Sequence, residues 1–166
     1  MSIGMQERDS MRKGSWIVAL IATVTISACG RSAEPGAPSI TVYKTATCGC
    51  CRQWVQHLRD AGFDVDARDV ENLNPIKERV GVPAGHGSCH TAEVAGYFVE
   101  GHVPAEDIKR LLAEHPDAKG LAVPGMPIGS PGMETPSGEV KPYEVLLVAR
   151  DGSTTVFAHH EQEAPK

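Results

Sequence analysis

Four cysteines carry the chemistry that this sequence can perform most readily. Cys48, Cys50 and Cys51 lie within four consecutive positions, and Cys89 lies further along the chain. Cys48 and Cys51 have the C-x-x-C spacing of dithiol redox motifs, and Cys50 is a third thiol inside that motif. At the start of a helix, free amide N–H groups and the helix dipole stabilise thiolate over thiol. The pattern therefore predicts thiolate chemistry, either disulfide exchange or the binding of a soft metal.

A structural disulfide is the alternative interpretation of these cysteines. Neighbours this close in sequence close only small, strained rings. A cross-link over so short a loop would also constrain the unfolded chain very little. A disulfide reductase needs only one attacking and one resolving thiol, so Cys50, Cys89 and the adjacent His90 exceed that requirement. We therefore favour a functional cluster over a structural cross-link.

Two elements must position the first three cysteines. Residues 40–43 are β-branched and aromatic, which is typical of a buried strand. Trp54, Val55 and Leu58 form one apolar stripe of a helix, and Gly62 is suited to end it. The three thiols thus lie where a strand ends and a helix begins.

The rest of the chain continues the alternation of strands and helices. Strands are predicted at residues 63–70, 91–94 and 97–100, and helices from Asn74 to Gly81 and from Pro104 to His115. The resulting order, β-α-β-α-β-β-α, predicts an α/β fold of the thioredoxin-like type. A Gly/Pro/Met-rich loop at residues 120–142 and a C-terminal β-hairpin, residues 143–149 and 154–158, are expected to follow.

The fold analogy also predicts what faces the three thiols. Thioredoxin-like folds place a loop opposite the C-x-x-C motif at the start of the third strand, and here Ser88, Cys89 and His90 occupy that position. Met126 and Met133 add thioethers, which bind Cu(I) and which Zn²⁺ seldom uses. An iron–sulfur cluster on the cysteines would leave the methionines without a role. Copper is therefore the metal that best accounts for these donors.

Several of these residues also have a purely structural interpretation. Met126 and Met133 could fill gaps in the core, and His90 could orient Cys89 by a hydrogen bond instead of binding a metal itself. The remaining candidate histidines fit ordinary surface positions as well as metal binding: His86, His102, His159 and His160.

The N-terminal residues predict export. Residues 1–28 contain a basic segment and then an apolar run, which is short for a membrane span and typical of a signal peptide. Residues 26–29 resemble a bacterial lipobox, so Cys29 is predicted to carry a lipid; an ordinary signal peptide cleaved nearby is the alternative. Residues 29–39 form a predicted flexible tether, residues 40–158 the folded domain and residues 159–166 a polar tail. The expected location is the periplasm, with the membrane reached only through the lipid.

Composition narrows the choice of partners. The net charge is −5, and removing a leader with three basic and two acidic residues makes it −6 without creating a basic patch. Nucleic-acid binding is therefore not expected. In an oxidising compartment, thiols persist if they are paired, metal-bound or kept reduced for a purpose. The chain is long enough for one domain with a core.

Four separated motifs resemble those of the CopG-like periplasmic copper-resistance proteins, a family long known only as a domain of unknown function. The motifs are residues 42–51, 88–91, 101–105 and 125–134, and the resemblance spans roughly residues 40–152. It implies a thioredoxin-like fold that binds copper through its cysteines and handles copper between Cu(I) and Cu(II). The clustered thiolates themselves fit one or several Cu(I) ions that share sulfurs. The resemblance also implies that Cys48, Cys50, Cys51 and Cys89 are copper thiolates and that Met126 and Met133 belong to the family's methionine loop.

Two functions follow as hypotheses. The first is a copper-binding protein for copper resistance, whose partners are copper ions and other periplasmic copper-handling proteins. The residues fit storage or chaperoning as well as redox turnover by a copper oxidoreductase. The second is a thiol–disulfide oxidoreductase in which Cys48 attacks and Cys51 resolves.

Overall fold

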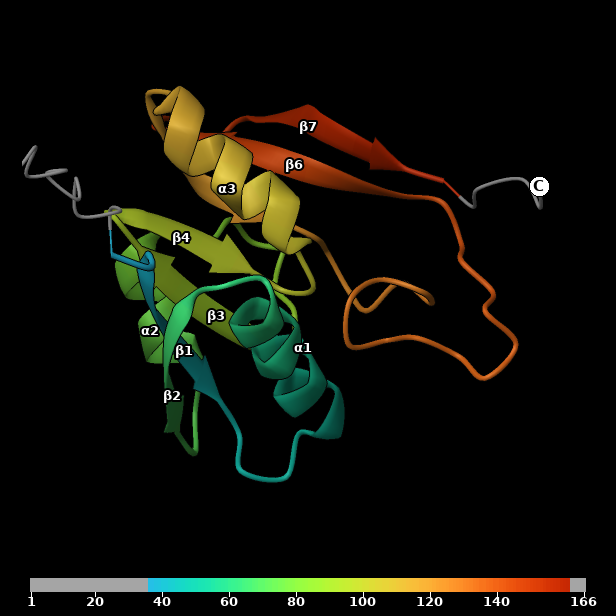
Figure 1. Ribbon diagram of the computed structural model, residues 1–166. Helices are drawn as coiled ribbons and strands as arrows, with labels where there is room; N and C mark the ends of the chain where they lie inside the picture. Colours follow the sequence, from blue (N-terminus) through green and yellow to red (C-terminus); the bar gives the residue numbers. More distant parts are fainter. Residues whose placement is uncertain (1–35, 162–166) are drawn as a thin grey trace, which may run out of the picture. The chain divides into compact units, whose positions relative to one another are not determined.

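A mixed, seven-stranded β-sheet is the frame of the computed structural model, which describes residues 36–161 (Figure 1). Its strands are arranged in the order β2-β1-β3-β4-β5-β6-β7. They are β1 (Ser39–Lys44), β2 (Asp64–Asp69), β3 (His90–Val94), β4 (Tyr97–Glu100), β5 (Ala118–Ala122), β6 (Tyr143–Ala149) and β7 (Thr154–His160). The predicted signal peptide, the lipid site Cys29, most of the tether and the last residues of the tail lie outside the described residues.

Three helices cover the two faces of this sheet. They are α1 (Gly49–Asp60), α2 (Asn74–Val80) and α3 (Ala105–Glu114). The main core contains buried residues of α1 and α3, whereas α2 packs against a separate, smaller cluster. Thus α1 and α3 lie on one face and α2 on the other. Within the described residues, no helix has the length and apolarity to cross a membrane.

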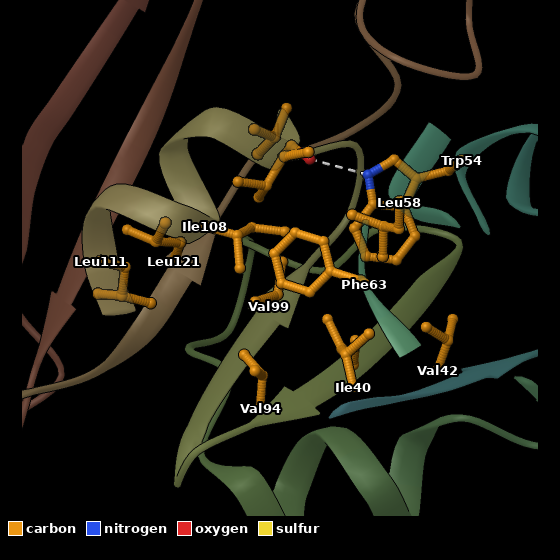
Figure 2. Packing of buried hydrophobic residues seen from close by; sticks show 14 of the residues in the cluster. Ile40, Val42, Trp54, Leu58, Phe63, Val94, Val99, Ile108, Leu111 and Leu121 are labelled. Atoms are coloured by element: carbon orange, nitrogen blue, oxygen red, sulfur yellow. Dashed lines mark hydrogen bonds between the residues drawn. The ribbon is translucent and has the colours of Figure 1, made fainter. Parts of the chain in front are cut away.

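The main core holds α1 and α3 against the sheet (Figure 2). Trp54 and Leu58 of α1 and Ile108 and Leu111 of α3 are all fully buried. Burial of one such side chain stabilises the fold by about 1.5–3 kcal/mol. The Trp54 indole N–H donates to the carbonyl oxygen of Val103 at 2.8 Å, so its polar group is satisfied inside the core. This bond also ties α1 to the segment that precedes α3.

The strand pairing brings distant segments of the chain to one end of the sheet. β1 is parallel to β2 and antiparallel to β3, and β3 forms an antiparallel hairpin with β4. α1 begins shortly after the end of β1. The start of β3 and the end of β4 lie at this same end of the strands. These three chain segments therefore meet beside the start of α1.

The predicted order of the first seven elements is confirmed, and so is the C-terminal hairpin. The expected loop at residues 120–142 is wrong at its start, because β5 runs through Gly120 to Ala122. Gly120 is needed there: a Cβ at this position would lie 2.0 Å from the carbonyl oxygen of Phe98 in β4. In the sequence, a glycine that is needed for close contact between strands cannot be distinguished from a glycine that begins a loop.

Two boundaries also differ from the predictions. β7 continues to His160, so His159 and His160 belong to a strand and not to a polar tail. The alternation of apolar and polar residues at positions 63–70 is typical of a half-buried strand, but five of the six residues of β2 are exposed and Val65 is partly buried. The reason is that β2 is an edge strand of the sheet, with β1 as its one neighbour.

Candidate metal centre

Cys48 and Cys51 lie at the start of α1. Cys48 is the N-cap residue, and its sulfur accepts the backbone N–H of Cys51 at 3.3 Å. A disulfide joins the two residues, whose Cα atoms are 5.3 Å apart. Cys51 is buried and Cys48 is partly exposed. The structure therefore holds the oxidised form of the predicted redox pair.

Cys50 and Cys89 are free thiols that face each other beside this disulfide. The Cys50 sulfur is 3.5 Å from that of Cys48 and 3.9 Å from that of Cys89. All four cysteine sulfurs lie within 4.8 Å of one another, and we call them the four-cysteine group. The expectation that Cys89 would lie opposite the C-x-x-C motif is confirmed by these distances.

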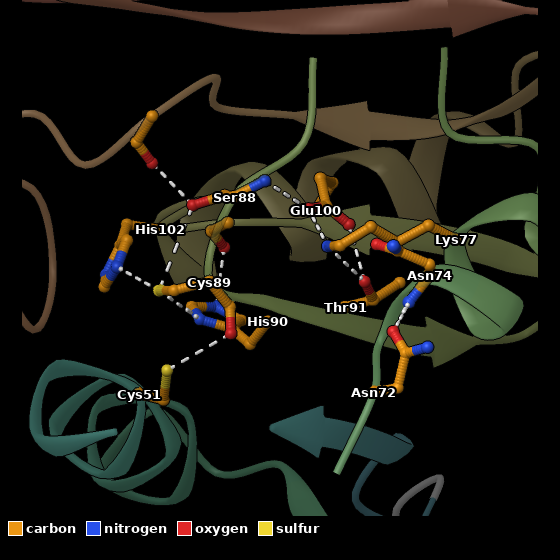
Figure 3. A network of polar contacts seen from close by, with 12 residues as sticks. Cys51, Asn72, Asn74, Lys77, Ser88, Cys89, His90, Thr91, Glu100 and His102 are labelled. Atoms are coloured by element: carbon orange, nitrogen blue, oxygen red, sulfur yellow. Dashed lines mark hydrogen bonds and ion pairs between the residues drawn. The ribbon is translucent and has the colours of Figure 1, made fainter. Parts of the chain in front are cut away.

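Two imidazoles also lie beside Cys89 (Figure 3). The Cys89 sulfur is 3.4 Å from Nδ1 of His90 and 3.2 Å from Nε2 of His102. These three residues form a second set of close ligand atoms, which we call the Cys-His-His group. Cys89 thus belongs to both groups.

Backbone carbonyls assign the tautomer of each imidazole. Nε2 of His90 lies 2.9 Å from the carbonyl oxygen of Gly101, and Nδ1 of His102 lies 2.8 Å from that of Pro131. A carbonyl oxygen only accepts, so each of these nitrogens must carry a proton. In a neutral ring, the other nitrogen then points its lone pair at the Cys89 sulfur. Such carbonyl partners are the usual means of orienting a metal-binding histidine.

Burial keeps both rings neutral. It lowers the pKa of His90 well below the ordinary value of 6.5, and the neighbouring His102 lowers it further. The pKa of His102 is also lowered, again mainly by burial. His90 packs between the Trp54 ring, 4.3 Å away, and the His102 ring, 4.9 Å away. Neutral imidazole is the form that binds metals.

The Cys89 thiol is protonated in the metal-free protein. Burial, and then the neighbouring Cys50, raises its pKa to about 11. A metal must therefore displace a proton from Cys89 when it binds, and binding will be stronger at higher pH.

The lowered histidine pKa values predict that the metal-free protein loses stability in acid. His57 contributes as well, because half-burial lowers its pKa and its Nε2 accepts the N–H of Ala105 at 3.0 Å. Below about pH 6.5 the unfolded chain gains protons that the folded chain does not, so the free energy of unfolding falls by up to about 1.4 kcal/mol per pH unit for each histidine.

Denaturant unfolding at pH 7.5, 6.5 and 5.5 measures this effect. We expect the highest stability above pH 6.5 and a smaller slope below it in His57→Gln, whose amide oxygen can still accept the Ala105 N–H. Replacement of the exposed His159 by Gln is the control and should leave the slope unchanged. A stability that stays constant between pH 7.5 and 5.5 would contradict the prediction.

The donor atoms suit a soft metal. The two groups offer sulfur and imidazole nitrogen, and neither includes a carboxylate. Sulfur ligands favour Cu(I), whereas Mg²⁺ and Ca²⁺ prefer oxygen. Cys48 and Cys51 can act as thiolate ligands only after their disulfide is reduced, because the thiolate is the metal ligand.

We call the Gly/Pro/Met-rich loop between β5 and β6 the methionine loop. Its backbone contacts both the segment before Cys89 and the start of α1. The hydroxyl of Ser88 donates to the carbonyl oxygen of Gly125, next to Met126. Gly132, next to Met133, lies so close to α1 that a Cβ there would be 2.7 Å from the carbonyl oxygen of Cys50. The Met126 side chain is 51 % exposed and that of Met133 is partly buried. The role of both thioethers as ligands stays a prediction.

The other histidines divide into one that belongs with the site and several that do not. The sequence position of His102 fits an ordinary surface residue, but His102 is buried and next to Cys89. Nδ1 of His86 lies 3.2 Å from its own loop's Ala84 carbonyl oxygen. His159 pairs with Glu144 across the hairpin, and His160 contacts Asp107 at 2.6 Å. These last three histidines are in neither ligand group.

Comparisons with known proteins agree with this geometry. A family model described as a protein of unknown function, DUF411, matches residues 86–133. Two solved structures, forms 2 and 1 of "Copper resistance protein copG", are each 45 % identical and cover 75 % of this chain. The match covers 99 % and 98 % of those chains, with TM-scores of 0.72 and 0.71. No curated protein matches the sequence.

Proposed function

Since the chain belongs to the family of copper resistance protein CopG, we propose that it binds copper and serves copper resistance. The observation that carries this proposal is the position of Cys89, whose sulfur is shared by the four-cysteine group and the Cys-His-His group. One sulfur at the junction of two ligand sets is suited to bridge two metal ions, because a thiolate has several lone pairs.

Copper in this site would be held mainly by sulfur. The reduced four-cysteine group supplies the thiolates that Cu(I) prefers, and His90 and His102 add neutral nitrogen donors that also suit Cu(II). Met126 and Met133 lie in the loop next to the site, and their thioethers would favour Cu(I) further. The proposed cargo is therefore one or more copper ions that share sulfurs.

The disulfide supports a redox role in addition to binding. When the thiols of Cys48 and Cys51 form their S–S bond, they release two protons and two electrons. Two Cu(II) ions that take up these electrons become two Cu(I) ions. The reverse reaction reduces the disulfide and oxidises two Cu(I). A single exchange of this kind needs no further cofactor, whereas repeated conversion in one direction needs an external dithiol or oxidant that restores the Cys48–Cys51 pair.

We also infer the setting in which this chemistry takes place. The β-α-β-α-β-β-α order and the cysteines at the start of α1 support a thioredoxin-like architecture. The N-terminal sequence supports export to the periplasm as a lipoprotein anchored at Cys29. Partners would then be other copper-handling proteins of that compartment.

An anaerobic Cu(I) titration of the reduced protein against a competing chelator tests the proposal. We expect tight binding of at least one Cu(I), lost in a variant in which every cysteine of the four-cysteine group is replaced by serine. Electron paramagnetic resonance before and after oxidation then separates redox work from storage, because Cu(II) gives a signal and Cu(I) does not. Weak binding by the wild-type protein would reject the proposed function.

Thiol–disulfide exchange is the second candidate function, and the Cys48–Cys51 disulfide favours it. Cys48 is the more exposed of the two and so the expected attacking thiol, while the buried Cys51 would resolve the mixed disulfide. The metal-free protein should then reduce insulin with a dithiol as electron donor. Loss of this activity in Cys48→Ser but not in Cys50→Ser would support the exchange function.

A further inference from the structure

A buried carboxylate binds the residue that precedes Cys89 and belongs to neither ligand group. Glu100, the last residue of β4, is fully buried and forms an ion pair with Lys77 of α2. Its carboxylate also accepts the hydroxyl of Thr91 at 2.6 Å and the backbone N–H of Ser88 at 2.5 Å (Figure 3). Nζ of Lys77 donates to the Thr91 hydroxyl at 2.9 Å, which closes the network.

This network is expected to add little net stability to the fold. Burying the Glu100 carboxylate and most of the Lys77 side chain costs several kcal/mol per ion, and a well-packed apolar pair often stabilises a protein as much or more. In some proteins a buried ion pair instead holds a particular arrangement of the chain. The hydrogen bonds of Glu100 indicate which arrangement it holds here.

The carboxylate fixes the segment that leads into Cys89. Residues 83–88 connect α2 to β3, and within the described chain their hydrogen bonds to other elements come from Ser88. The N–H of Ser88 binds Glu100, and its hydroxyl binds the carbonyl oxygen of Gly125 in the methionine loop. Ser88 precedes Cys89 directly, so its position sets where the shared sulfur lies.

Glu100 also directly precedes, in sequence, the segment that positions His90 and His102. The next residue in the chain, Gly101, provides the carbonyl oxygen that binds His90 Nε2, and His102 follows. The backbone of Glu100 is held in turn, because its carbonyl oxygen accepts the N–H of Val123 at 2.9 Å. One residue thus secures the chain on both sides of the Cys-His-His group.

We propose that the Lys77–Glu100 pair positions Cys89 for metal binding, acting through Ser88. Within the described chain the side-chain hydrogen bonds and ion pairs of Lys77 and Glu100 go to Ser88, Thr91 and each other and not to a ligand atom, so the role of the pair is positioning and not coordination. Lys77 belongs to α2, on the opposite face of the sheet from α1. The pair therefore links α2 to a site whose other side is built on α1. In its metal-binding part this inference rests on the proposed copper function.

Glu100→Gln tests the proposal with little change of shape. Glutamine keeps one oxygen acceptor but places an amide donor among the three donors that now point at the carboxylate, and it leaves the charge of Lys77 unpaired. We expect the segment before Cys89 to loosen. Cu(I) affinity should fall about 10–100-fold, as when other partners that orient metal ligands are removed.

A second measurement needs no metal. In the oxidised protein Cys50 and Cys89 are the free thiols of the described chain, so iodoacetamide labelling followed by peptide mapping reports each separately. We expect labelling of Cys89 in Glu100→Gln to become about tenfold faster, as its segment opens more often, while labelling of Cys50, which is held in α1, changes much less. A loss of overall stability alone would not produce this selectivity.

Glu93→Gln is the matched control. Glu93 lies in β3 and forms an ion pair with Arg79, but this pair is largely exposed and does not contact Ser88. The control should bind Cu(I) and label as the wild type does. If Glu100→Gln does not fold, Lys77→Met, which removes the other partner of the pair, replaces it, and a change in the same direction is expected.

The Cu(I) titration and the labelling experiment together distinguish failure of the positioning role from failure of the proposed copper function. If the wild-type protein binds no Cu(I), the copper function fails, and the labelling experiment still tests the positioning of Cys89. If the wild type binds Cu(I) and a folded variant of the pair matches it in both affinity and Cys89 labelling, the positioning role is overturned.

Discussion

Replacing Cys89 with serine should cause the largest loss of copper binding of any single cysteine substitution in the described chain. Its sulfur is the one atom shared by the four-cysteine group and the Cys-His-His group, so the substitution damages both. A serine hydroxyl does not ionise near neutral pH and is a hard donor, poorly suited to Cu(I). We expect Cu(I) affinity to fall by at least about 100-fold, the upper end of what the loss of an outer partner causes.

The measurement is an anaerobic titration with Cu(I) against a competing chelator. Cys48→Ser is the informative comparison, because Cys48 belongs to the four-cysteine group alone and its loss should cost less affinity. Thermal unfolding of the metal-free variants checks that each still folds. Cys89→Ser with the copper stoichiometry and affinity of the wild type would contradict the assignment of Cys89 as the shared ligand. In cells, the proposed function predicts increased copper sensitivity for the same variant.

Gly132→Ala should destabilise the protein and disturb the site at once. Gly132 has φ +85°, and a Cβ there would lie 2.7 Å from the carbonyl oxygen of Cys50 and 2.8 Å from the backbone nitrogen of Trp54. An L-residue in the left-handed region costs about 1–2 kcal/mol, and relief of the clash with α1 adds about 1–3 kcal/mol. We therefore expect a loss of roughly 2–5 kcal/mol in the free energy of unfolding, measured with denaturant.

The effect on the site follows from the residue beside Gly132. The carbonyl oxygen of Pro131 is the acceptor that orients the His102 ring. A loop lifted from α1 would move this acceptor, so Cu(I) affinity should fall together with stability. Gly138→Ala is the matched control, because Gly138 has φ +69° and a Cβ there would meet nothing within 4 Å. Equal losses of stability in the two variants would show that the contact with α1 is unimportant.

The parts of the fold that are encoded locally could be predicted from sequence. The strand before the cysteines, the apolar stripe of α1 and the tight turn between β3 and β4 each depend on residues close together in the chain. Their patterns survive because the same residues that set local conformation also form the core. Trp54 is an example: its spacing predicts burial, and it is fully buried.

The role of His102 could have been found from the hairpin and was missed. The predicted turn at residues 95–96 fixes the register that pairs Thr91 with Glu100. Continued by two residues, this register places Cys89 opposite His102. The residue type of His102 and its position before a helix do not reveal that it lies opposite Cys89. Hairpin register is thus a better guide to paired ligands than sequence distance.

The Cys48–Cys51 disulfide corrects the expectation that cysteines this close in sequence form only strained cross-links. Ring strain excludes bonds between close neighbours such as Cys50 and Cys51, but the helical turn from Cys48 to Cys51 brings their Cα atoms to 5.3 Å. This distance is within the range of ordinary disulfides. The two cysteines of the C-x-x-C pair are therefore spaced to form a disulfide, unlike closer neighbours in the chain.

Other features depend on tertiary contacts and left no local pattern. The carboxylate of Glu100 is buried because Lys77, Ser88 and Thr91 converge on it from three parts of the chain. In sequence, Glu100 reads as an ordinary polar residue at the end of a strand. The donor of a buried acceptor can be identified only when the elements that carry both are placed in space.

The wide separation of the site's parts along the chain has a consequence for how the protein would acquire copper under the proposed function. Cys48, Cys50 and Cys51 are adjacent in any conformation, whereas Cys89 and His102 join them only after β1, β3 and β4 have paired. An unfolded or newly made chain thus has a local thiol trio that can capture copper, and folding completes the coordination. Metal held by the complete site favours the folded chain by mass action. Bound copper should therefore slow proteolysis and amide hydrogen exchange in β3 and β4, strands that contribute no thiol to the trio.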